Sequence, residues 1–93
     1  MLKLQTNKND ENDMRLIETN TQTILGYIIK FWFHGSWSYC TTVHKPEGIT
    51  GANMASMEDA LGMIIVENEI MTVEEWEALC KKHPVSNFSC QIE

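Results

Sequence analysis

The strongest pattern in the chain is a run of β-branched and aromatic residues over 23–44, interrupted once by the His-Gly-Ser segment at 34–36. Such residues favour strands, and a short glycine-containing break between two runs indicates a tight turn. The pattern therefore predicts a β-hairpin with strands over 24–33 and 37–44. The segment 45–48 (Lys-Pro-Glu-Gly) ends the second strand, because proline has no N–H to donate to a ladder.

Alternation along the hairpin assigns its side chains to two faces, with odd positions of the first strand opposite even positions of the second. One face holds Tyr27, Ile29, Phe31, Phe33, Ser38, Cys40, Thr42 and His44. The other holds Ile28, Lys30, Trp32, His34, Trp37, Tyr39, Thr41 and Val43. We expect the first face to pack on the helices. The second is either covered by other parts of the chain or meets a partner or a second copy through its aromatic residues.

The second half of the chain has two helix-start signals, in each of which a hydroxyl residue precedes an acidic residue by three positions. These pairs are Ser56 with Asp59, and Thr72 with Glu75. They predict helices over about 57–67 and 73–83, each with one apolar stripe. Pro84 ends the second helix, because its ring cannot continue a helix.

The remaining segments are shorter. Residues 2–5 and 14–20 are strand candidates, and residues 5–13 are so polar that we expect a loop or mobile arm there. The alternating tail over 87–92 is compatible with one more short strand. Residues 1–93 are thus expected to form a single α+β domain: a small antiparallel sheet built on a central β-hairpin, with two helices packed on one face.

Composition narrows the class of protein. Hydrophobic residues make up 43% of the 93 residues, which fits a globular domain and argues against disorder throughout. No apolar run approaches the ~20 residues that a membrane span requires. The first seven residues contain no apolar signal stretch, so we expect a cytoplasmic location and no membrane partner.

The net charge of −6 lies entirely in the C-terminal half. Residues 1–50 hold five acidic and five basic residues, whereas residues 51–93 hold eight acidic residues against Lys81 and Lys82. Such a surface repels phosphate backbones, so it disfavours direct nucleic-acid binding and favours a basic protein partner. The alternative is a solvated helical face that only keeps the protein soluble.

Cysteine and histidine positions outline one candidate metal site. Cys80 and His83 are three positions apart on the second expected helix, so their side chains are neighbours. The helix end would let Cys90 return to the same place, and the hairpin would supply Cys40, with His44 as its substitute. These four ligands, Cys40, Cys80, His83 and Cys90, suit one tetrahedral zinc ion. The alternative is that the cysteines are small buried apolar residues and His83 interacts with the helix dipole.

Signs of an enzyme are weak. The chain has no nucleotide-binding glycine loop, no G-x-S-x-G elbow and no H-E-x-x-H motif. A nucleophilic pair could be assembled from Cys40 or Cys80 with His34 or His44, but no spacing demands it. The glutamates of the second helix fall on an expected exposed face, where acid–base catalysis is poorly supported.

The hairpin together with the segment GANMASMEDAL at 51–61 resembles the strand–strand–helix half of HicB-type antitoxins, over less than half of the chain. It lacks their proline-glycine-cysteine turn, and no function is transferred. In type rather than motif, a short acidic α+β chain without a catalytic signature resembles the anti-CRISPR proteins of phages and mobile elements. That resemblance implies action in a bacterial host cell, by binding basic surfaces of Cas nucleases and blocking the loading of guide or target DNA.

The leading hypothesis is a non-enzymatic inhibitor or interaction protein that docks its acidic half on a basic, nucleic-acid-handling partner. The expected steering residues are Glu67, Glu69, Glu74, Glu75 and Glu77. Trp32 or Trp37 would be the apolar anchor. Two other classes stay open: a small zinc-stabilised structural or regulatory module, and a cysteine-dependent enzyme. A homodimer is compatible with each of them.

Overall fold

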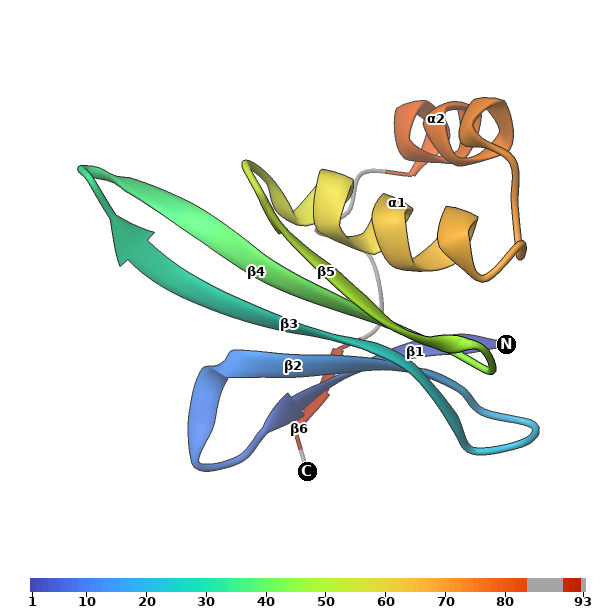
Figure 1. Ribbon diagram of the computed structural model, residues 1–93, viewed down its shortest axis with the longest axis horizontal. Coiled ribbons are helices and arrows are strands. Elements are labelled where there is room, and N and C mark those ends of the chain that lie inside the picture. The colour runs from blue at the N-terminus through green and yellow to red at the C-terminus, as the bar shows by residue number, and fades with distance from the viewer. Residues whose placement is uncertain (84–89, 93) are drawn as a thin grey trace.

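The chain folds into one sheet with two helices packed on one of its faces (Figure 1). The computed structural model describes residues 1–83 and 90–92. In chain order the elements are β1 (Leu2–Asn7), β2 (Asp10–Glu18), β3 (Thr23–Phe33), β4 (Ser36–Lys45), β5 (Gly48–Met54), α1 (Met57–Glu67), α2 (Val73–Lys82) and β6 (Cys90–Ile92). The strand order is β5-β4-β3-β2-β1-β6, with β1 to β5 antiparallel and β6 parallel to β1. The predicted α+β architecture is confirmed.

The hairpin of β3 and β4 lies at the centre of the five antiparallel strands, as predicted. Its register places Ile28 opposite Thr41, in agreement with the alternation expected from the sequence. His34 and Gly35 form the turn, with φ angles of +49° and +80°. Two successive left-handed residues make a type I′ turn, whose twist matches that of the flanking strands. Histidine is among the residues that accept this backbone conformation, and glycine adopts it without strain.

The helices pack on the opposite face of this hairpin from the one expected. Its three completely buried side chains are Ile28, Thr41 and Val43. Ile29, on the face expected to be buried, is instead 46% exposed. We expected the more apolar face of the hairpin to be buried, but the face that is buried is the one that α1 can approach closely. Gly26 lies on the Ile28 face, and a Cβ atom there would be only 2.9 Å from Ile64 of α1. The missing side chain at Gly26 therefore lets α1 lie directly on the sheet.

Residues 5–13 are not the polar loop or mobile arm expected from their composition. They form the end of β1, a two-residue turn and the start of β2. The side-chain oxygen of Asn7 supports the turn by accepting the N–H of Asn9 at 2.9 Å. Thr6 is buried, whereas Gln5 before it is only half-buried. A hairpin with a polar outer face needs few apolar residues, so the low apolar content of this segment did not indicate a hairpin.

β5 is a strand that the sequence did not predict. Pro46 and Glu47 form a tight turn, after which Gly48 pairs with Lys45, so proline ends β4 without ending the sheet. Every residue of β5 except Met54 is exposed, and the strand lies at the outer edge of the sheet. Because β5 buries so little, its sequence carries no alternating apolar pattern.

Both predicted helices are confirmed with their N-terminal caps. The Ser56 hydroxyl accepts the N–H of Asp59 at 3.1 Å at the start of α1. Thr72 and Glu75 form a reciprocal capping box at the start of α2. Neither helix, nor any other helix among the described residues, is long and apolar enough to cross a membrane.

Trp76 makes a close contact between the two helices. Trp76 of α2 is buried and belongs to the same core cluster as Leu61 and Ile64 of α1. It lies against Gly62, where a Cβ atom would come within 2.6 Å of the indole Nε1 atom. Gly62 therefore lets α2 pack closely on α1, and Figure 1 shows α1 between α2 and the sheet.

Candidate functional site

The far end of the central hairpin is a two-stranded ribbon without neighbours on either side. The pairing of β2 with β3 ends at Ile29, and the pairing of β5 with β4 ends at Tyr39. Residues 30–38, which we call the aromatic ribbon, therefore pair only within the hairpin of β3 and β4. Figure 1 shows this end of β3 and β4 projecting from the molecule. An isolated two-stranded hairpin is only marginally stable in water, so its own side chains must hold it together.

Aromatic contacts hold the ribbon together and leave it apolar on both faces. Trp32 and Trp37 face each other across the strands, edge to face, with ring centroids 5.2 Å apart. The Lys30 ammonium lies 4.6 Å from the Trp37 ring centroid. Trp32 is 60% and Trp37 is 44% exposed, and Phe33 on the other face is 51% exposed. Contiguous exposed apolar surface of this kind marks interaction sites more often than scattered residues do.

The predicted steering residues form an acidic surface around the connection between α1 and α2. This acidic surface consists of Glu67, Glu69, Glu74, Glu75 and Glu77, all of them exposed. Two of the five are already engaged. Glu67 accepts a hydrogen bond from Lys45 Nζ at 3.2 Å, and Glu75 accepts the N–H of Thr72 in the capping box. Within residues 1–83, the other three make no ion pair, so their charge faces solvent.

The contacts of these two acids shift the pKa values of Lys45 and Glu75. The hydrogen bond to Glu67 raises the pKa of Lys45, and Glu47, 3.7 Å away, adds to the effect. The bonds from the Thr72 backbone and hydroxyl lower the pKa of Glu75. The Lys45 ammonium and the Glu75 carboxylate therefore keep their charge over a wider pH range.

The aromatic ribbon and the acidic surface do not form one compact patch. In Figure 1 the β3–β4 turn lies at one end of the long axis, and the α1–α2 connection lies at the other. This separation could not be judged from the sequence alone. An interface that includes Trp32 and Glu74 must therefore extend along the molecule, whose longest dimension is 33 Å.

A groove that the sequence did not reveal lies between α1, α2 and the end of β5. Its volume is about 380 Å³. Its lining residues are Met54, Glu58, Asp59, Gly62, Met63, Val66, Glu67, Val73, Trp76 and Glu77. The spacing of Asp59, Met63 and Val66 along one side of α1 was visible in the sequence. That these residues face α2 across a groove depends on tertiary packing.

The structure describes the side chains of only some of the proposed zinc ligands, and it places Cys40 and Cys80 on opposite sides of the sheet. Cys80 is buried on α2 in the core between the helices and the sheet. Cys40 pairs opposite Ile29 on the face that the helices leave uncovered. His44 lies on that same open face, with its ring 5.1 Å from Tyr27. The sheet therefore separates both hairpin candidates from Cys80.

The other members of the zinc set give no further support for it. His83 is the exposed C-cap of α2, and the side chain of Cys90 lies outside the described residues. Residues 1–83 and the backbone of 90–92 contain no group of three histidine, cysteine or acidic residues placed to hold a metal ion. Burial and the nearby Glu58 carboxylate raise the pKa of the Cys80 thiol, which keeps it protonated and weakly nucleophilic.

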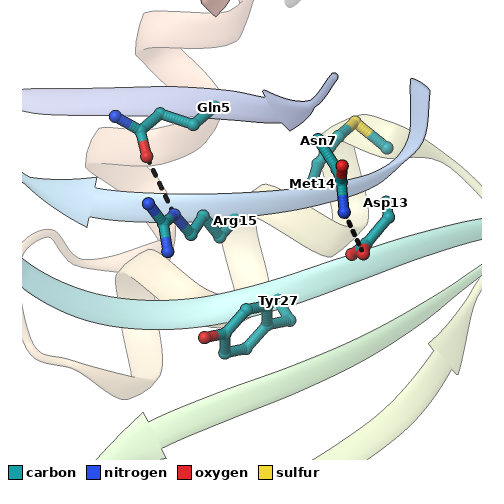
Figure 2. A pocket seen from close by; sticks show the side chains of 6 residues that line it. All are labelled: Gln5, Asn7, Asp13, Met14, Arg15 and Tyr27. Carbon is teal, nitrogen blue, oxygen red and sulfur yellow. Dashed lines mark hydrogen bonds between the residues drawn. The ribbon is translucent and has the colours of Figure 1, made fainter. Parts of the chain in front are cut away.

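The open face of the sheet contains one small hollow, shown in Figure 2. Its volume is about 100 Å³, and it is lined by Gln5, Asn7, Asp13, Met14, Arg15 and Tyr27. Gln5 accepts a hydrogen bond from Arg15 Nε at 2.8 Å, and Asn7 donates to Asp13 at 3.3 Å. Ligand pockets usually measure ~300–1,000 Å³, so this hollow is too small for a typical substrate.

Comparison with protein-family models, with curated proteins and with solved structures finds no match to this chain. Function is therefore inferred from three features of its own surface: the aromatic ribbon, the acidic surface and the groove between the helices.

Proposed function

We propose that this protein is a non-enzymatic inhibitor that binds a basic surface of a nucleic-acid-handling protein. The observation that supports this proposal is the separation of charge from apolar surface. The whole net charge of −6 arises in residues 51–93, and the acidic surface there is exposed. Residues 19–46, which include the aromatic ribbon, contain no acidic residue at all. Steering and anchoring are thus assigned to different ends of the molecule.

The two surfaces would act in different phases of binding. Uncompensated carboxylates such as Glu74 and Glu77 attract a positively charged partner over roughly one Debye length, ~8 Å at physiological salt, and so speed the encounter. Exposed tryptophan rings lose little conformational entropy on burial and often dominate the affinity of an interface. Trp32 and Trp37 are therefore the expected anchors once the partners are aligned.

Nucleic-acid channels are the basic surfaces that best fit an inhibitor of this kind, because they are lined with lysine and arginine that normally contact phosphates. An acidic protein that occupies such a channel competes with the nucleic acid. The resemblance in type to anti-CRISPR proteins makes Cas nucleases the first partners to test. Occupation of their channel would block loading of the guide or the target DNA.

A charge-reversal experiment tests this proposal. The variant carries Glu74→Lys and Glu77→Lys, while Glu75 is kept because it caps α2. Binding to purified Cas nucleases, with and without guide RNA, is measured together with inhibition of DNA cleavage. We expect the wild-type protein to bind at least one nuclease, and the double reversal to weaken that binding at least about tenfold, equivalent to ~1.4 kcal/mol.

The matched control is Asp10→Lys with Glu11→Lys, which changes the net charge equally on the β1–β2 hairpin. It should retain most of the affinity, and circular dichroism should show both variants folded. Equal loss in both variants would mean that net charge alone matters. A wild-type protein that binds none of the nucleases contradicts the assignment to Cas nucleases.

A further inference from the structure

The groove between α1 and α2 combines an apolar floor with an acidic rim. Met63 and Val66 of α1 form one side of it, and Val73 and Trp76 of α2 form the other. Val73 is 50% exposed although it is fully apolar, and Trp76 contributes a ring that is otherwise buried. Apolar side chains left open between two helices are a common docking place for a segment of another protein.

The charges around this floor are all of one sign. The acidic lining residues are Glu58, Asp59, Glu67 and Glu77, and no lining residue is basic. Lys45 already compensates Glu67 from outside the groove. The rim therefore retains about three uncompensated carboxylates next to an apolar floor. A purely apolar occupant would leave these charges unpaired, and a purely basic occupant would leave the floor exposed to water.

We infer that this groove binds a basic amphipathic helix of the partner, with leucine-like side chains on the floor and lysine or arginine side chains against the rim. The inference rests on the proposed function and names the element of the partner that is recognised. α1 presents its lining residues at helical spacing, from Glu58 and Asp59 through Gly62 and Met63 to Val66 and Glu67. A partner helix laid along this row meets acidic positions at both ends of it and the apolar Met63 and Val66 between them.

The chain itself supplies a local reporter for this site. Of its three tryptophans, only Trp76 lines the groove, whereas Trp32 and Trp37 are on the aromatic ribbon. A Trp32→Phe and Trp37→Phe variant therefore has tryptophan fluorescence from Trp76 alone. The probe is a synthetic amphipathic helix built from leucine and lysine. Two matched peptides replace either every lysine by glutamate or every leucine by serine.

We expect the leucine–lysine peptide to change the Trp76 emission saturably and to shift the NMR signals of Gly62 and Met63, and neither matched peptide to do so. Reversing two rim charges, Asp59→Lys and Glu77→Lys, should weaken binding at least about tenfold. The control reversal, Glu69→Lys with Glu74→Lys, removes the same charge outside the groove. It should weaken peptide binding less than about threefold, the part due to long-range attraction.

Other outcomes reject the groove as a binding site without testing the proposed inhibitor function. Equal binding of the lysine–serine peptide means that attraction is diffuse and the apolar floor is not used. Equal loss from the two reversals, or no response of Trp76 at all, also rejects the site. Self-association that saturates the same reporter as protein concentration rises would make a second copy the occupant. In each case, the proposed function is kept if nuclease binding still depends on Glu74 and Glu77. If nuclease binding does not depend on them, the groove site and the proposed function are both rejected.

Discussion

Gly62 shows how a single missing side chain determines the packing of the two helices. A Cβ atom at this position would lie 2.6 Å from Nε1 and 2.8 Å from Cδ1 of Trp76. Contacts this short force the ring or the helix to shift. In the interior of an ordinary helix, by contrast, replacing glycine with alanine stabilises by about 1 kcal/mol.

Gly62→Ala is therefore expected to destabilise the protein, by about 1–2 kcal/mol, because overpacking costs ~1–3 kcal/mol and outweighs the gain in helix propensity. Urea unfolding measures the change. In a Trp76→Leu background the added methyl group has room, so the same substitution should become neutral or stabilising. Additive effects of the two substitutions would show that the contact is not the cause.

Cys80 connects burial to pH dependence. Its thiol pKa is raised above the ordinary value of 9.0, mainly by burial and further by Glu58. The unfolded chain therefore loses this proton at lower pH than the folded chain does. The contribution of Cys80 to stability is complete below the ordinary thiol pKa and declines as the pH rises above it.

The urea concentration at the midpoint of unfolding should accordingly fall further between about pH 7 and about pH 10 in the wild-type protein than in the Cys80→Ala variant. Cys40→Ala, on the open face of the sheet, is the matched control and should keep the wild-type pH dependence. If the wild type and Cys80→Ala have parallel pH profiles, the thiol is not the titrating group.

At the scale of elements, the aromatic ribbon should unfold locally before the rest of the sheet. It pairs with no strand outside the β3–β4 hairpin, and the Trp32–Trp37 contact joins its two strands. Cross-strand pairs of this kind contribute ~0.2–1 kcal/mol, much less than a buried core residue does.

Trp32→Ala should increase amide hydrogen exchange within residues 30–38 and lower global stability by less than about 1 kcal/mol. Trp76→Ala is the contrasting variant, because it removes a buried indole and should cost about 3–5 kcal/mol. Exchange that increases across the whole sheet in Trp32→Ala would show that the ribbon is part of the cooperative core.

The sequence was sufficient for the elements whose signals are local. The hairpin turn, its register and the two capped helices follow from residues near each other in the chain, such as Ser56 with Asp59. It was insufficient where tertiary contact decides. The buried face of the hairpin depends on Gly26 meeting Ile64, and the hairpin of β1 and β2 has a polar outer face that resembles a loop. The predicted steering acids are exposed, but their distance from Trp32 could not be derived from spacing.

At the scale of the whole molecule, separate charged and apolar surfaces predict separate kinetic effects. Glu74→Lys with Glu77→Lys should slow association with the partner and reduce its dependence on salt, because screening acts mainly on long-range attraction. Trp32→Ala should instead speed dissociation at every salt concentration. Surface plasmon resonance over about 0.05–0.5 M salt distinguishes the two, since the Debye length falls several-fold over that range. If both variants changed only dissociation, the acidic surface would not be a steering element.

The pairing of β6 with β1 joins segments from nearly the two extremes of the sequence, with Leu4 opposite Cys90. During synthesis on the ribosome, β1 is made more than eighty residues before this neighbour exists. Until then its outward N–H and C=O groups are open to any other extended chain. A stalled or shortened polypeptide that lacks residues 90–92 is thus expected to associate through β1, because it is the pairing with β6 that closes this edge of the sheet.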